Sequence, residues 1–162
     1  MKTKKDILYV SIQLILFVCF TFNGYHFIEL EWPLLINRIG LIVAIIGVIT
    51  ILIAMLQLNK NLSPFPSPKE EGELISTGLY KLIRHPIYTG IIWGALGYGI
   101  YKESIVKIVI GLLLYVLFQF KARYEESLLK HKFPNYEKYL LETERFFPNF
   151  GNLIGARFSD EK

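Results

Sequence analysis

The segment LLINRIGLIVAIIGVITILIAMLQL, residues 34–58, carries one charged side chain, Arg38, in an otherwise apolar run. A helix needs about 20 mostly apolar residues to cross the hydrocarbon core of a bilayer. Arg38 lies near one end of the run, where its long side chain can extend to the membrane surface. The segment therefore predicts a transmembrane helix over residues 34–58.

Three further apolar blocks surround this segment, at residues 7–28, 87–101 and 105–120. Of the 162 residues, 52% are hydrophobic, and they are gathered into these blocks. The first block is longer than the core of a signal peptide, and no small-x-small cleavage site follows it, so we expect it to be retained. We expect one all-α domain over residues 1–162, an integral membrane bundle of four transmembrane helices with a cytoplasmic C-terminal helical segment.

The basic residues predict the orientation of this bundle. Of the 18 Lys and Arg residues, fifteen fall in the N-terminal segment, in the central segment 59–85 or after residue 120; the others are Arg38, Lys102 and Lys107. Because Lys and Arg collect on the cytoplasmic side of a membrane, we expect both termini and the central segment to face the cytoplasm, with the chain in the cell membrane. Basic residues there meet lipid headgroups, so the net charge of +4 does not indicate nucleic acid.

Two polar clusters flank the third and fourth apolar blocks. The first is GLYKLIRHPIYTG at residues 78–90, and the second is KARYEE at residues 121–126. If the connecting turn is centred on Glu103, His85 and Glu125 differ in depth by about four residues, or roughly 6 Å along antiparallel helices. The two clusters can therefore form one site at the cytoplasmic interface. The alternative is that one cluster only anchors a helix and the other is a solvated helix face.

These residues resemble the isoprenylcysteine carboxyl methyltransferase family, whose wider group includes the phospholipid N-methyltransferases. The resemblance rests on LISTGLY at 74–80, RHPIYTG at 84–90, the Glu125–Glu126 pair and the later Tyr136-x-x-Tyr139, and it covers about residues 59–148. It implies a pocket for S-adenosylmethionine made by segments 72–90 and 121–148. Gly72 stands where the family often has a histidine, and residues 133–136 form a shorter motif than is usual.

The resemblance also implies roles for single residues. A basic residue before the glutamate pair is expected to bind substrate, and both Lys121 and Arg123 are candidates for this catalytic position. The residues expected to bind the cofactor are Glu73, Leu74, Ile75, Tyr80, His85, Pro86, Ile87, Tyr88, Glu125 and Glu126, to which the chemistry below adds Arg84.

The chemistry of these side chains suits the cofactor. Faces of Tyr80 and Tyr88 can stabilise a sulfonium cation, and Glu125 can accept hydrogen bonds from ribose hydroxyls or an ammonium group. Arg84 or His85 can pair with a carboxylate. Methyl transfer is a direct displacement that mainly requires alignment, so we expect no covalent intermediate. We expect no metal either, and the single cysteine, Cys19, allows no intrachain disulfide.

The sequence thus predicts an S-adenosylmethionine-dependent methyltransferase with a lipophilic or lipidated acceptor, such as an isoprenylcysteine-like carboxylate. Membrane lipid is the expected surrounding partner, and the oligomeric state stays open. The alternatives are a phospholipid N-methyltransferase, a nicotinamide-dependent membrane reductase of related fold, and a non-catalytic membrane protein. We expect the segment after Pro134 to cover the cofactor as a lid, the alternative being a helix that rests on lipid.

The orientation can be tested with a single cysteine introduced at Pro66 in a Cys19→Ser background. The charge distribution predicts that this cysteine is protected from a membrane-impermeant thiol reagent in intact cells and reacts after permeabilisation. Labelling in intact cells would contradict the predicted orientation.

Overall fold

The structure is a computed structural model that describes residues 3–22 and 31–148. These residues form five α-helices and two short 3-10 turns and contain no β-strand. The α-helices are α1 (Lys4–Thr21), α2 (Leu34–Leu58), α3 (Pro86–Tyr101), α4 (Ile105–Lys132) and α5 (Tyr136–Glu142), and the 3-10 turns are η1 (Asn59–Asn61) and η2 (Gly78–Lys81). The predicted all-α class is confirmed for this part of the chain.

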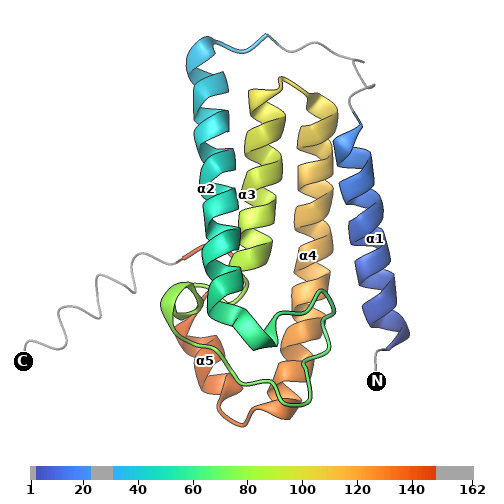
Figure 1. Cartoon of the computed structure of the whole chain (residues 1–162), viewed down its shortest axis with the longest axis vertical. Coiled ribbons are helices and arrows are strands. Elements are labelled where there is room, and N and C mark those ends of the chain that lie inside the picture. The colour runs from blue at the N-terminus through green and yellow to red at the C-terminus, as the bar shows by residue number, and fades with distance from the viewer. Residues whose placement is uncertain (1–2, 23–30, 149–162) are drawn as a thin grey trace, which may run out of the picture.

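The four long helices stand side by side in the order α2, α3, α4, α1 (Figure 1). Helix α2 packs on α3, α3 packs on α4, and α1 packs on the outer side of α4. The short turn between α3 and α4 lies at one end of the row. At the other end, the start of α1, the end of α2, the long α2–α3 connection and α5 come together (Figure 1).

The helix bounds agree closely with the apolar blocks. Helix α2 covers residues 34–58, and α3 begins at Pro86, one residue before the predicted span. Helix α1 begins at Lys4 and ends at Thr21, and the rest of the first predicted span, residues 23–28, lies outside the described residues. Helix α4 continues twelve residues beyond position 120 to Lys132. It therefore carries the second polar cluster on a rigid helix.

The helix surfaces are apolar. Helices α2 and α4 are long and apolar enough to cross a membrane. The side chains of Leu35 and Leu56 on α2 are 71% and 80% exposed, and Ile15 on α1 is 60% exposed. Contiguous apolar surface of this kind is rare on soluble monomers, whereas helices with apolar exteriors are the form in which a chain crosses lipid. Among the described residues, two helices meet the length and hydropathy requirements, and the full set of four spans stays a prediction.

Small residues let α2 and α3 approach closely. A Cβ atom on Gly47 would lie 2.5 Å from the backbone nitrogen of Gly94, and one on Gly97 would lie 2.5 Å from that of Ala44. Such contacts between helix backbones are how membrane helices pack without large side chains. The buried residues of α2 are all small: Gly40, Ala44, Gly47 and Ala54.

We therefore expect Gly97→Ala to destabilise the bundle by about 1–3 kcal/mol, because the added methyl group must push two backbones apart. Gly94→Ala is the matched control in the same helix, since a Cβ at Gly94 meets no atom within 4 Å. Thermal unfolding in detergent micelles measures both variants. Equal stability of the two variants would contradict the close-packing interpretation.

Candidate active site

A cavity of about 420 Å³ lies at the end of the bundle where α1 begins and α2 ends. Its volume falls in the range of about 300–1,000 Å³ typical of small-molecule sites. Helix side chains such as Ile51, Met55 and Ile91 give it an apolar part. The α2–α3 connection, the start of α3, α4, α5 and Gln13 of α1 supply the remaining wall, which contains most of its polar groups. The cavity can therefore hold a ligand with both polar and apolar portions.

A stack of rings forms one side of this cavity. The ring of Tyr88 lies between those of His85 and Phe118, with centroid distances of 5.2 and 4.6 Å and interplanar angles of 5° and 4°. The Tyr88 hydroxyl donates a 2.7 Å hydrogen bond to Oε2 of Glu125, whose side chain is 25% exposed. Because the stack holds Tyr88, it also fixes the Glu125 carboxylate at the cavity wall.

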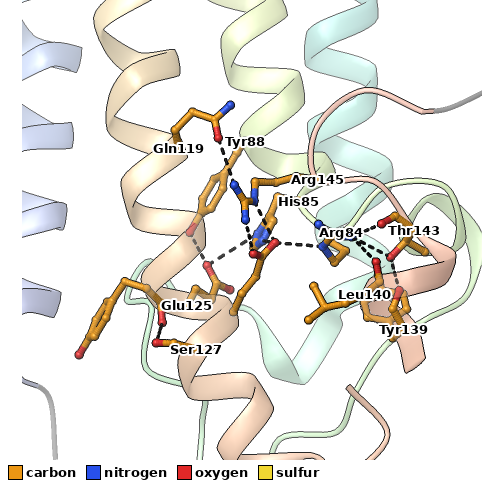
Figure 2. A network of polar contacts seen from close by, with 12 residues as sticks. Arg84, His85, Tyr88, Gln119, Glu125, Ser127, Tyr139, Leu140, Thr143 and Arg145 are labelled. Carbon is orange, nitrogen blue, oxygen red and sulfur yellow. Dashed lines mark hydrogen bonds and ion pairs between the residues drawn. The ribbon is translucent and has the colours of Figure 1, made fainter. Parts of the chain in front are cut away.

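The neighbouring carboxylate, Glu126, is buried and has different partners. Arg84 Nε donates to its Oε1 at 2.9 Å, and Arg145 Nη2 donates to its Oε2 at 2.5 Å. His85 Nε2 lies 3.3 Å from Oε1. Figure 2 shows Arg84, His85 and Arg145 arranged around this point. A buried carboxylate is stable only when cations and hydrogen-bond donors surround it, so Glu126 serves to join three parts of the chain.

One of those parts is residues 143–147, which we name the C-terminal strap. The backbone N–H groups of Arg84 and His85 donate to the carbonyls of Glu144 and Arg145 at 2.8 and 3.1 Å. Arg84 Nη1 also donates to the Thr143 carbonyl (Figure 2). Phe146 is 2% exposed and packs in the bundle core. The strap is therefore held firmly beside the start of α3.

Tyrosines of α5 and the α2–α3 connection close the cavity next to the strap. Tyr139 donates a 2.5 Å hydrogen bond to the carbonyl of Tyr80. Burial raises the pKa of Tyr139 to about 12. Burial likewise raises the pKa values of Tyr80 and Tyr136 above the usual range. All three phenols thus stay neutral near pH 7 and can act as hydrogen-bond donors.

Lys121 is a buried cation on α4, about one helical turn before Glu125. Its side chain is 1% exposed, and Nζ donates to Gln13 Oε1 at 2.7 Å and to the Pro64 carbonyl at 2.9 Å. Nζ also lies 5.2 Å from the centroid of the Tyr88 ring. No carboxylate among the described residues lies within ion-pair distance of it. An ammonium has three donors, so Lys121 has one left for a ligand.

A family model describes the region that contains these groups. Residues 35–136 match the model of the phospholipid methyltransferases, which is more than half of the chain. The chain belongs to the phospholipid methyltransferase family. The resemblance seen in the sequence motifs is thereby confirmed. Together with the apolar helix surfaces, this membership makes the chain an integral membrane protein.

The chain is similar to proteins that carry different functional names. The chain is 34% identical to the nickel-cobalt-cadmium resistance protein NccN of Alcaligenes xylosoxydans xylosoxydans over 51% of this chain and 39% of that protein. It is 32% identical to the protein-S-isoprenylcysteine O-methyltransferase of Saccharomyces cerevisiae, over 56% of this chain and 39% of that protein. The chain thus spans about two fifths of the length of these relatives.

A solved structure shows the same fold. The eukaryotic intramembrane Ras methyltransferase, an isoprenylcysteine carboxyl methyltransferase, superimposes with a TM-score of 0.65 at 22% identity. The match covers 91% of this chain and 54% of that one. The helical arrangement of Figure 1 is therefore the fold of that protein.

The structure brings most of the residues predicted from the family resemblance to one cavity. Those that line it are Glu73, Leu74, Ile75, Tyr80, Arg84, His85, Ile87, Tyr88, Lys121 and Glu125. Pro86, Arg123 and Glu126 do not. Pro86 is the first residue of α3, Arg123 points outward on α4, and Glu126 is buried behind the wall. Which of the lining residues bind a ligand stays a prediction.

Sequence reasoning missed Gln13 and Asp6, which lie in the first helix. Gln13 lines the cavity and contacts Lys121, and Asp6 is fully buried. A signal for each is present in the sequence. Gln13 is a polar residue inside an apolar block, and Asp6 follows Thr3 at the spacing of a capping box, which the structure contains. Among the described residues, no group of His, Cys, Asp or Glu could hold a metal ion.

Substitutions of Glu125 and Glu126 should have different effects on stability and on ligand binding. We expect Glu126→Gln to destabilise the protein by about 3 kcal/mol or more, because it leaves buried cations without their carboxylate. Glu125→Gln should leave stability nearly unchanged, since Tyr88 can still donate to the amide oxygen, and should weaken binding of S-adenosylhomocysteine about ten- to hundredfold. Thermal unfolding and isothermal titration calorimetry measure the two effects. Equal effects of both variants on both measurements would contradict the assignment.

Proposed function

We propose that the chain is an S-adenosylmethionine-dependent methyltransferase whose lipophilic acceptor enters the cavity from the bilayer. One observation carries the proposal: a single cavity joins an apolar, helix-lined part to polar groups fixed at its wall, Glu125 by the ring stack and Lys121 by α1. The polar part lies at the end of the bundle that the basic residues assign to the cytoplasm. A water-soluble cofactor and a membrane-soluble acceptor can meet there.

The residues present fit the cofactor. When bound, S-adenosylmethionine supplies a methyl group on a sulfonium cation. Glu125 is a partly exposed carboxylate that can accept hydrogen bonds from hydroxyl or ammonium groups of such a ligand. Tyr80 places an aromatic ring at the wall, where it can stabilise a cation. The faces of the Tyr88 ring are covered by His85 and Phe118, so Tyr88 acts by holding Glu125. The Arg84 side chain donates hydrogen bonds to Glu126 and to the strap, so it supports this wall. The His85 ring lies close to the carboxylates of both Glu125 and Glu126.

The acceptor that suits this cavity carries a carboxylate on an apolar chain. Lys121 is a buried ammonium without a carboxylate partner in the described protein, and burying an unpaired charge is costly. A ligand carboxylate would offset that cost, whereas the ammonium of a phospholipid amine would be repelled. Ile51, Met55 and Ile91 would contact the apolar chain. The yeast relative is named an isoprenylcysteine O-methyltransferase, which agrees with such an acceptor.

In this proposal the protein acts by orientation. Lys121 would hold the acceptor carboxylate, while Glu125 and the ring stack would hold the donor side of the cavity. The rigid strap and α5 would keep water from the space between them, which preserves the alignment that a direct displacement needs. No side chain has to form a covalent bond to the transferred group.

The proposal is tested with the purified protein in lipid nanodiscs and S-adenosylmethionine carrying a labelled methyl group. We expect labelled ester to form on a farnesylated cysteine derivative with a free carboxylate. Label on phosphatidylethanolamine instead would support the phospholipid amine alternative. Tight binding of NADPH with no binding of S-adenosylmethionine would favour a reductase, and binding of neither would indicate a non-catalytic protein.

Lys121 and Arg123 can be distinguished by matched substitutions. We expect Lys121→Met to raise KM for the carboxylate acceptor about tenfold to a hundredfold, because a charged hydrogen bond is lost. Arg123→Met should change KM less than about twofold, since the exposed side chain lies outside the cavity. Steady-state kinetics with the farnesylated cysteine derivative measure both. The reverse ranking would assign the acceptor contact to Arg123.

A further inference from the structure

We propose that α1 is part of the site: Asp6 and Gln13 are positioning residues that hold one wall of the cavity in its binding shape. The wall is formed by residues 62–68, which we name the proline loop, and all seven of them line the cavity. The family model begins at residue 35, so α1 lies outside the region it matches. This inference rests on the proposed function in one respect, namely that the cavity binds the cofactor or its product.

The first attachment joins Asp6 to Ser67. The Ser67 hydroxyl donates to Asp6 Oδ2 at 2.5 Å, and the Ser67 backbone N–H donates to Oδ1 at 3.1 Å. Asp6 is itself fixed, because Thr3 N–H donates to its Oδ2 at 2.8 Å in the capping box. The carboxylate is 0% exposed. A buried carboxylate that accepts from both groups of one residue is a strong and directional attachment.

The second attachment runs through Lys121. Its ammonium donates both to Gln13 Oε1 and to the Pro64 carbonyl, at 2.7 and 2.9 Å. Gln13 lies seven residues after Asp6, which is about two helical turns along the same side of α1. The helix therefore contacts the proline loop directly at Ser67 and indirectly at Pro64.

The composition of the proline loop explains why it depends on these attachments. Proline has no backbone N–H, so Pro64, Pro66 and Pro68 cannot donate to a neighbouring strand or helix. Between Pro64 and Pro68 only Phe65 and Ser67 carry an N–H group. The Phe65 N–H donates within the loop, to Ser63 Oγ at 3.1 Å. The Ser67 N–H is thus the main-chain donor that ties the stretch between Pro64 and Pro68 to α1.

A loop that is fixed before the ligand arrives does not have to be ordered on binding, and this preserves affinity. Since α1 packs on α4 at the edge of the row, a change at Asp6, which does not line the cavity, should loosen the wall without removing a group of the cavity lining. The expected signature is weaker binding and a more mobile loop in a protein that is still folded.

The experiment compares Ser67→Ala, Asp6→Ala and the double variant in the full chain, in detergent micelles. Ser67→Ala leaves the capping box intact, so it tests the attachment without weakening the start of α1. Ser76→Ala, an exposed serine of the same connection, and Ser11→Ala, an exposed serine of α1, are matched controls. The two readouts are amide exchange of Phe65 and Ser67 without ligand, and Kd for S-adenosylhomocysteine.

We expect each single variant to speed loop exchange and raise Kd about five- to tenfold, with unchanged helical content. The double variant should be no worse than the poorer single variant, because both remove one contact. Unchanged loop exchange would overturn the attachment, and faster exchange with an unchanged Kd would overturn the positioning role. The wild-type protein could fail to bind S-adenosylhomocysteine while the variants still loosen the loop. That result would overturn the proposed function and the positioning role, and it would support the attachment of the loop to α1.

Discussion

The Glu126 carboxylate is the interaction on which the site end of the molecule depends. It lies on α4, while its cationic partners come from the turn before α3 and from the C-terminal strap. Three parts of the chain beside the cavity are therefore joined at one buried charge. Such a charge is stable only while all of its partners are present, so the network favours a single arrangement of these elements. The cost of burying Glu126 makes the arrangement specific rather than simply compact.

Much of the fold follows from the sequence because each apolar block is long enough to form one helix. Helix α2 has the bounds expected from its apolar run, and the short α3–α4 connection requires antiparallel neighbours. The same geometry brings His85 and Glu125 to one level, and their side chains lie 3.8 Å apart. These relations are local or involve adjacent helices, so periodicity and length are sufficient to predict them.

Periodicity and length could not predict that Glu125 lines the cavity while Glu126 is buried in the ion-pair network. Adjacent residues on a helix point about 100° apart, and only the packing of the strap and α3 decides which carboxylate faces the cavity. The contact of Asp6 with Ser67 spans sixty-one positions in the chain. No pattern within a short window reports such a contact. The family resemblance identified the motif residues but did not extend to α1, where Gln13 completes the wall.

The order of the helices in the row has a consequence for biosynthesis. Helix α1 is made before α2, yet they stand at opposite edges, and α1 packs on α4 (Figure 1). Helix α1 must therefore wait until α4 has been made before it finds its neighbour. The contacts of α1 with the proline loop and Lys121 can form only after that step. Assembly of the cavity thus follows synthesis of nearly the whole chain, and a truncated product that ends before α4 would have helices but no enclosed site.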